Sequence, residues 1–568
     1  MPEAGMELHS GLKLLDFVAI ACYLLVTFGI AVWFGRKQST SEEFFVGGRH
    51  IPWFAVGLSI LATLFSTLSY LGSPGEVIKH GIGFYCGYLA LPFTIIVISR
   101  FWIPFYMKLN LISAYQYLEY RFNYRLRCVG AGLFVLLRLG WMSMVVFAAA
   151  MALDRVKGPD LEILSGPDLY WWMAIIGIVA AIYSAVGGIQ AQIWTDVLQC
   201  LLLLAGAIMV ISAVMVASGA GPTQWVATIS EKSSEHLTPP LFSWDITLRV
   251  TIVTAAINHF FWAICTHGSD QVVLQRYFST SSLKAARRSY YISIFTELVM
   301  IGLLSICGIA LLTFYLQHPE ALPPGWTTAN SADKLFPHFL SHHLPAGCAG
   351  LVISAFLCDA IQTLEAGVNS ITAVIATDFL PNRADKAGKD NPRAESGKLS
   401  LTAVRVLSIA IALLVSANAM FVAQLALEGG MTIIDMTPKF FNMFIGPLAA
   451  MFFIGMFLPR CTGRSVFIAV FVGIVTAVLW NWGKEIFGTT TGPTILLAIA
   501  FPCVVTMLTA FVLSLFVEDG RPHHGLNFTW KAIVLGNQHS ANTLSNRSDE
   551  SNAINEPDRS EVKPGSML

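Results

Sequence analysis

The chain has 568 residues, of which 55% are hydrophobic and only 12% are charged, and its mean hydropathy is +0.64. This composition excludes a water-soluble globule of ordinary type. The 35 Lys and Arg residues balance 35 Asp and Glu, so the net charge gives no indication of a nucleic-acid partner. The ten cysteines stand singly, without a CxxC or paired ligand spacing, and indicate neither a disulfide framework nor a zinc site.

Apolar runs of about 20 residues, the length that spans the hydrocarbon of a bilayer, recur along the whole chain. The sequence therefore predicts an all-α polytopic membrane protein with about thirteen transmembrane helices. The expected helices cover residues 13–34, 52–71, 82–107, 129–152, 169–186, 193–217, 247–267, 289–315, 345–377, 400–424, 430–457, 463–483 and 492–517.

The charges around the first run predict its orientation. Acidic Glu3 and Glu7 precede it and basic Arg36 and Lys37 follow it, which is the reverse of a secretory signal. Lys and Arg are also concentrated in every second loop, so we expect a multi-pass protein of the cell membrane with its N-terminus outside. An odd number of helices then places the C-terminus in the cytoplasm.

The ninth run carries a stripe of polar side chains at bilayer depth. Polar groups are expensive there and usually face a bundle interior or a water-filled path, so we expect an ion or solute path. A purely structural polar seam between helices is the alternative. At about 100° per residue the stripe contains Asp359, Gln362, Thr363, Asn369 and Ser370, with Glu365 on its flank.

Several other runs are interrupted by polar residues, glycine or proline. The second run contains SILATLFSTLSYLGSPG at 59–75, the seventh contains WAICTHGS at 262–269, and the eleventh has glycines and prolines. A broken helix at membrane depth is tolerated only where it lines a cavity or binds something. Because the first two interruptions lie five helices apart, they indicate an inverted-repeat transporter with its site at the midplane.

Seven segments resemble motifs of the sodium:solute symporter family, and the likeness extends over about residues 44–517. EFFVGGR, YSAVGGIQAQIWTDVLQ, DQVVLQRYFS and VNSITAVIATDF resemble the family in general. LGSPGEVIKHGIGF, YQYLEYRF and GPLAAMFFIGMFLPRCTGRS are most similar to the branch that holds iodide, monocarboxylate and multivitamin symporters.

This resemblance implies a LeuT-like fold with two inverted five-helix repeats, and sodium-driven symport of a small solute by alternating access. The chain then divides into four parts. An extra transmembrane helix and a cytoplasmic loop (1–51) precede the ten-helix transport core (52–458), which is followed by C-terminal transmembrane helices (459–517) and a cytoplasmic tail (518–568). The tail is rich in Ser, Asn and charge, and its composition predicts disorder.

The resemblance also implies a sodium site that joins backbone carbonyls of Ala62 and Phe65 to side chains of Asp359, Gln362 and Thr363. The chain departs from the family here, because most relatives have Ser or Thr in place of Gln362 and a small residue in place of Asp359. Carboxylate and amide oxygens still suit sodium, which is a hard cation. We expect sodium as the coupling ion and no other cofactor; proton coupling through Asp359 is the alternative.

Two further residues match the family's most specific segment. Asp196 and Gln199 are expected on a sodium release path. For Asp196 the alternative is a carboxylate at a helix start, favoured by the helix dipole.

The substrate is expected between the first and sixth core helices. A sugar is disfavoured, because the amide, acidic and aromatic residues of sugar-transporting relatives are replaced here. The similarity of the loops gives a weak preference for a small organic acid or another anion. Arg138 suits a substrate carboxylate, but its pairing with Asp359 or Glu365 is the favoured expectation. The candidate substrate residues are Ser66, Ser69, Tyr70, Asn258, Thr266 and His267.

Two other classes of function are less well supported. An enzyme would need a nucleophile elbow, a metal cluster or a phosphate cradle, and the sequence contains no GxSxG, HExxH or Walker pattern. A non-transporting solute sensor on the same scaffold would need a signalling domain, which the tail does not offer. The expected partners are therefore a small-molecule solute, the sodium ion and the lipid bilayer.

Overall fold

The computed structural model describes residues 13–38, 40–65, 67–109, 111–156, 168–232, 243–245, 248, 250–345, 347–379, 400–429, 443–489, 492–516 and 524–536. Every regular element in these ranges is helical. This suits the composition, because a helix satisfies its backbone hydrogen bonds internally and can therefore cross hydrocarbon.

The α-helices are α1 (Leu14–Gly35), α2 (Ser41–Val46), α3 (Trp53–Leu64), α4 (Thr67–His80), α5 (Leu91–Val97), α6 (Ile103–Leu109), α7 (Gln116–Arg121), α8 (Tyr124–Val156), α9 (Asp168–Val186), α10 (Gly188–Ser218), α11 (Pro222–Lys232), α12 (Ile252–Ser269), α13 (Gln271–Phe278), α14 (Leu283–Gln317), α15 (Ala332–His343), α16 (Cys348–Val374), α17 (Leu401–Gly429), α19 (Met443–Phe457), α20 (Gly463–Phe487) and α21 (Ala500–Leu513). The 3-10 and π segments are η1 (Gly47–Arg49), η2 (Gly83–Ala90), η3 (Ile98–Trp102), η5 (Pro319–Ala321), η6 (Ile375–Phe379), η10 (Ile495–Leu497), η11 (His524–Phe528) and η12 (Lys531–Leu535).

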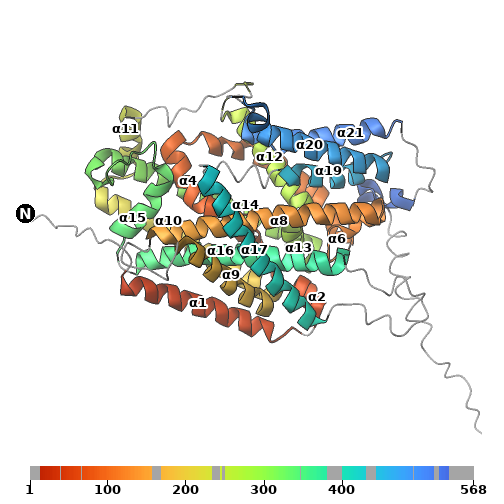
Figure 1. Cartoon of the computed structure of the whole chain (residues 1–568), viewed down its shortest axis with the longest axis horizontal. Coiled ribbons are helices and arrows are strands. Elements are labelled where there is room, and N and C mark those ends of the chain that lie inside the picture. The colour runs from red at the N-terminus through yellow and green to blue at the C-terminus, as the bar shows by residue number, and fades with distance from the viewer. Residues whose placement is uncertain are drawn as a thin grey trace, which may run out of the picture.

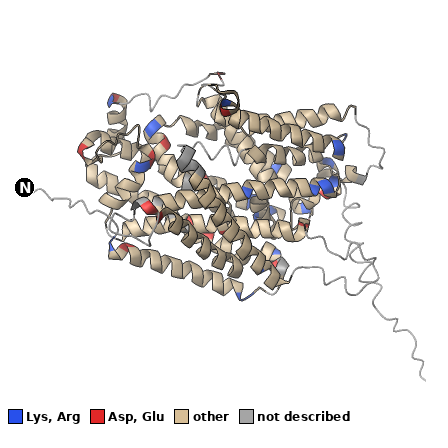
Figure 2. Ribbon diagram, viewed as in Figure 1, with Lys and Arg blue, Asp and Glu red and all other residues tan. Residues whose placement is uncertain are grey.

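Ten helices in the described part of the chain are long and apolar enough to cross a membrane, or eleven when the bent pair α3 and α4 counts as one span. The two other runs predicted from the sequence coincide with α12 and α19. The first has 18 residues and carries Asn258, His259 and His267, and the second has only 15 residues. Long stretches of the helices are uncharged, with Lys and Arg mainly near helix ends (Figure 2).

Helix α16 occupies the middle of the bundle and contacts α1, α8, α9 and α10, while α17 packs across α8 and α9 (Figure 1). Helices α19, α20 and α21 pack on one another at one edge of the molecule. Helix α3 lies against α10 and α14. Gly57 permits the close approach to α14, since an added Cβ would lie 2.5 Å from the carbonyl oxygen of Ser289.

The predicted break in the second run is confirmed. Helix α3 ends at Leu64, Phe65 is extended, and α4 leaves at a bend of 59°. The prediction of an interruption within 262–269 is wrong, because α12 continues through Ser269 and the extended residue is Asp270, with φ −84° and ψ 114°. The carboxylate of Asp270 accepts a hydrogen bond from the backbone N–H of Val272 and so caps α13. In the eleventh run α19 continues through Gly446 and Pro447, and residues 430–442 lie outside the described ranges.

Part of the tail is ordered, which corrects the expectation of disorder from residue 518 onward. Residues 524–536 form η11 and η12, which pack on α7 and α6. Trp530 donates a hydrogen bond from Nε1 to the carbonyl oxygen of Phe101 over 3.0 Å. Lys108 bonds the carbonyl oxygens of Ile533 and Val534. Aromatic packing of this kind is not visible in average composition, which is why the prediction failed here.

Candidate functional site

The polar face of α16 is turned into the protein. Every side chain of the predicted stripe is buried: Asp359, Gln362, Thr363, Glu365, Asn369 and Ser370. A helix lying on a membrane surface would leave such a face in water, so α16 does not lie on a membrane surface. The burial agrees with the expectation of polar groups that face a bundle interior.

Asp359 and Gln199, expected in two different roles, are in direct contact. Gln199 on α10 donates a hydrogen bond from Nε2 to Oδ1 of Asp359 on α16 over 2.5 Å. Both side chains are buried, Asp359 to 1% exposure. The amide therefore fixes the orientation of the carboxylate in the centre of the bundle.

Several buried oxygen atoms near this pair lack a hydrogen-bond partner among the described residues. They are Gln199 Oε1, Gln362 Oε1 and Thr363 Oγ1. Buried polar atoms are nearly always satisfied, so each exception needs an explanation. Neutral oxygens beside a carboxylate form a donor set that fits a hard monovalent cation.

The break between α3 and α4 brings the last carbonyl groups of α3 to the same region. The last carbonyls of a helix have no partner within it and carry its partial negative charge. Ala62 and Phe65 lie at this end of α3, which contacts both α10 and α16. The arrangement can therefore offer backbone oxygens opposite the α16 stripe.

Asp196 belongs to a buried charge network. Its Oδ2 accepts hydrogen bonds from Ser59 Oγ over 2.5 Å and from Arg276 Nη2 over 3.0 Å. Arg276 also donates from Nε to Ser59 Oγ over 2.7 Å. The carboxylate thus pairs with a guanidinium of α13, whereas the sequence alone suggested a release path or a dipole effect. Arg276 belongs to the DQVVLQRYFS motif. That Asp196 is its ion-pair partner could not be predicted from the positions of the two residues in the sequence, which are 80 apart.

The favoured expectation for Arg138 is wrong. Its guanidinium forms a two-pronged ion pair with Asp270, at the junction of α12 and α13, and not with Asp359 or Glu365. Both side chains of the pair are almost fully buried. Among the described residues, neither carboxylate oxygen of Glu365 has a hydrogen-bond partner. Its Oε1 lies beside Gly187, at the junction of α9 and α10.

The substrate candidates between residues 66 and 70 differ in what the structure shows of them. Ser69 is half-buried. Tyr70 is fully buried, donates a hydrogen bond to the carbonyl oxygen of Leu203 over 2.9 Å and packs edge-on against Phe336 of α15. Its hydroxyl is therefore used within the protein. Ser66 lies outside the described residues.

The candidates on α12 also differ from one another in burial and hydrogen bonding. Asn258 is half-buried, and the buried Thr266 Oγ1 has no hydrogen-bond partner in the part of the chain that the structure describes. His267 Nδ1 is hydrogen-bonded to the hydroxyl of Tyr277 over 2.7 Å. His259, seven residues before Thr266 and on the same helix face, also has a buried ring nitrogen without a partner.

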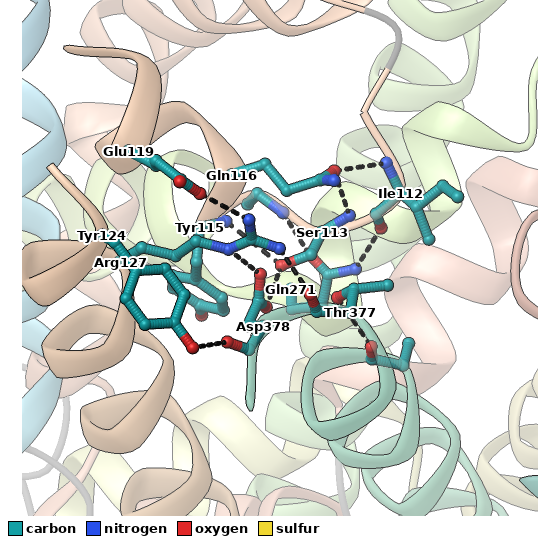
Figure 3. Close-up of polar contacts among 12 residues, drawn as sticks. Ile112, Ser113, Tyr115, Gln116, Glu119, Tyr124, Arg127, Gln271, Thr377 and Asp378 are labelled. Carbon is teal, nitrogen blue, oxygen red and sulfur yellow. Dashed lines mark hydrogen bonds and ion pairs between the residues drawn. The ribbon is translucent and has the colours of Figure 1, made fainter. Parts of the chain in front are cut away.

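The far end of α16 is held by a second network, shown in Figure 3. Asp378 accepts hydrogen bonds from Arg127 Nε over 2.6 Å and from Ser113 Oγ over 2.5 Å. Arg127 also pairs with Glu119 of α7 over 2.6 Å, and Gln271 bonds the carbonyl oxygen of Ile112 over 2.7 Å. The network thus ties the motifs VNSITAVIATDF, YQYLEYRF and DQVVLQRYFS together in space.

A multi-pass helical bundle with a broken helix facing a buried polar stripe defines a membrane transporter. It is not an enzyme. The chain belongs to the sodium:solute symporter family, whose sequence model matches residues 44–473. It is thus a sodium-coupled solute symporter by family.

Known relatives support this assignment. The chain is 28% identical to the sodium/sialic acid symporter NanT of Aliivibrio fischeri, over 82% of this chain and 87% of that protein. It is 27% identical to the human sodium-coupled monocarboxylate transporter 1, over 83% of this chain and 74% of that protein. These identities differ by one percentage point, so similarity does not select a substrate.

The fold has a counterpart among solved structures. A Na⁺-coupled sialic acid symporter in its substrate-bound outward-open state superposes with a TM-score of 0.75, at 24% identity, over 90% of this chain and 99% of that one. The likeness shows the LeuT-like fold expected from the sequence.

Proposed function

We propose that the protein couples the downhill entry of sodium to the uptake of a small organic acid by alternating access. The proposed sodium ligands are Asp359, Gln362 and Thr363 of α16 with the carbonyl groups of Ala62 and Phe65. The observation that carries the proposal is the pair of buried, unpartnered oxygens Gln362 Oε1 and Thr363 Oγ1 close to a buried carboxylate. A bound cation would satisfy these atoms, which otherwise cost free energy in the core.

The ion is proposed to leave past Gln199 and Asp196, toward the N-terminal end of α10.

The preference for an organic acid rests on the relatives, which carry sialic acid and monocarboxylates. The orientation rests on the loop charges, which favour an outside N-terminus and a cytoplasmic C-terminus.

The first test measures sodium binding without knowledge of the solute. Purified full-length protein is heated in increasing NaCl, with KCl keeping the ionic strength constant. Sodium should raise the Tm with a saturable midpoint, because a ligand of the folded state stabilises it. Thr363→Ala and Asp359→Asn should each raise that midpoint at least about tenfold, the loss expected for one charge-assisted or ligand contact.

The matched control is Ser354→Ala. Ser354 is also buried in α16, but its hydroxyl bonds the carbonyl oxygen of Gly350 in its own helix. The sodium midpoint of this variant should equal that of the wild type. An unchanged midpoint in Thr363→Ala and Asp359→Asn would contradict the proposed ligands. Solute uptake in vesicles, driven by a sodium or a proton gradient imposed separately, distinguishes sodium coupling from proton coupling through Asp359.

A further inference from the structure

Three side chains outside the proposed sodium site meet where η2, α12 and α14 come together. Tyr88 of η2 donates a hydrogen bond to Glu297 Oε1 of α14 over 2.9 Å. The Tyr88 ring lies against the ring of His259 of α12, with 4.4 Å between centroids. Trp262 lies one turn further along α12, and its ring centroid is 6.3 Å from that of His259. We call Tyr88, His259 and Glu297 the η2–α12–α14 cluster.

The cluster contains a carboxyl group, and no cation among the described residues is paired with it. Glu297 is half-buried within a membrane-spanning helix, where an isolated carboxylate is expensive. In the described part of the chain, Glu297 forms no ion pair, and two buried arginines are paired with other carboxylates. Arg138 is paired with Asp270, and Arg276 is paired with Asp196. A positive group from outside the chain would therefore be stabilised at this point.

The cluster also has unused hydrogen-bonding capacity. His259 Nε2 is buried without a partner, and Tyr88 satisfies one oxygen of the Glu297 carboxylate while the other is free to accept. A protonated amine offers N–H donors to both groups. Aromatic faces such as those of Tyr88 and Trp262 attract cations as well. Thr266 Oγ1, two turns along the same face of α12, is a further atom without a hydrogen-bond partner among the described residues.

We propose that the η2–α12–α14 cluster binds a positively charged nitrogen of the transported solute. This inference rests on the proposed uptake of a small organic acid and narrows it to a zwitterion, which carries both a carboxylate and an ammonium group. An anion without such a nitrogen leaves Glu297 uncompensated and is a poorer solute.

The test compares matched pairs of probes that differ only in the charged nitrogen. 4-Aminobutanoate is paired with pentanoate, and glycine betaine with 3,3-dimethylbutanoate. Each probe is titrated against purified full-length protein in saturating NaCl, and the midpoint of thermal stabilisation is recorded. At least one zwitterion should have a midpoint about tenfold or more below that of its analogue, because a charge-assisted contact is worth at least this ratio. Equal midpoints within both pairs overturn the inference.

The same titrations in variants assign the effect to the cluster. Glu297→Gln keeps an acceptor for Tyr88 but removes the charge, and should make the two members of each pair equal. Tyr88→Phe keeps the carboxylate and should keep the preference for the zwitterion. Glu231→Gln, an exposed position on α11, is the control and should behave as the wild type. A preference that persists in Glu297→Gln overturns the inference.

The outcomes separate this inference from the proposed function. If NaCl alone does not stabilise the wild-type protein, sodium coupling fails. If NaCl stabilises it and the probe pairs are equal, only the zwitterion is rejected. If Tyr88→Phe lowers the Tm and abolishes the preference, the contact of Tyr88 with Glu297 is a structural tie and the cluster is not a ligand site.

Discussion

Gln199 of α10 holds the carboxylate of Asp359 of α16 through a hydrogen bond from Nε2 to Oδ1. The two residues are 160 positions apart in the chain. Gln199 thereby becomes a positioning residue for the proposed sodium site, because it sets the direction in which the carboxylate points. Its own Oε1 is buried and unpartnered, and so is available to the same ion.

Gln199→Leu is expected to weaken sodium binding by about tenfold while leaving the fold intact, because one donor to Asp359 is lost from an apolar environment. The sodium midpoint of thermal stabilisation measures this. Gln199→Glu would place a second carboxyl group beside Asp359. At neutral pH it is expected to weaken sodium binding less than Gln199→Leu does. A wild-type midpoint in Gln199→Leu would contradict the positioning role.

Asp196→Asn is expected to destabilise the protein strongly, since it leaves the buried guanidinium of Arg276 without a counter-charge. Breaking one side of a buried pair costs about 3–5 kcal/mol. The Tm of the purified protein without sodium is the measurement. The double variant Asp196→Asn, Arg276→Met should recover much of the lost Tm, because the uncompensated charge is gone. A double variant as unstable as the single one would show that the ion pair is not the cause.

Two histidines of α15, His338 and His343, are expected to make the folded protein less stable in acid. Burial, with a smaller effect of His342 and His343, lowers the pKa of His338 from its ordinary value of 6.5 to about 4. Burial also lowers the pKa of His343 to about 4. Both rings are neutral in the folded protein but bind protons in the unfolded chain, so the stability present above pH 6.5 is lost as the pH falls toward 4.

The Tm measured between pH 7.5 and pH 4 should therefore fall less steeply in a His338→Gln, His343→Gln double variant than in the wild type. His318→Gln, at a more exposed position, is the control. An equally steep fall in the double variant would show that other groups cause the acid sensitivity.

Trp530→Ala should lower the free energy of unfolding by about 2 kcal/mol, because the ring that packs on Phe101 at 5.1 Å between centroids is removed. Trp530→Phe keeps the ring contact and loses only the hydrogen bond to the carbonyl of Phe101, so its effect should be smaller. Trp244→Ala, at a side chain 81% exposed, is the control. Thermal unfolding that is unchanged in Trp530→Ala would show that the segment 524–536 is loosely attached.

The polar stripe of α16 could be predicted because it depends on local properties alone. The length of an apolar run decides whether it spans a bilayer, and helical periodicity decides which side chains share a face. The same reasoning located the break after Leu64, and the motifs identified the family. It failed for the tail, where a few aromatic residues around Trp530 dock on α6 and α7 although the average composition predicts disorder.

The sequence by itself determined the membrane class, the order of the helices and which polar residues must be buried. Only the tertiary structure decided which of these residues meet: Arg138 with Asp270, Asp196 with Arg276, and Gln199 with Asp359. The physical reason is that burial follows from the cost of moving one side chain out of water, which is a property of that residue. Pairing depends on which helices become neighbours, and several carboxylates at similar depth would satisfy the same guanidinium equally well until packing brings one of them within reach.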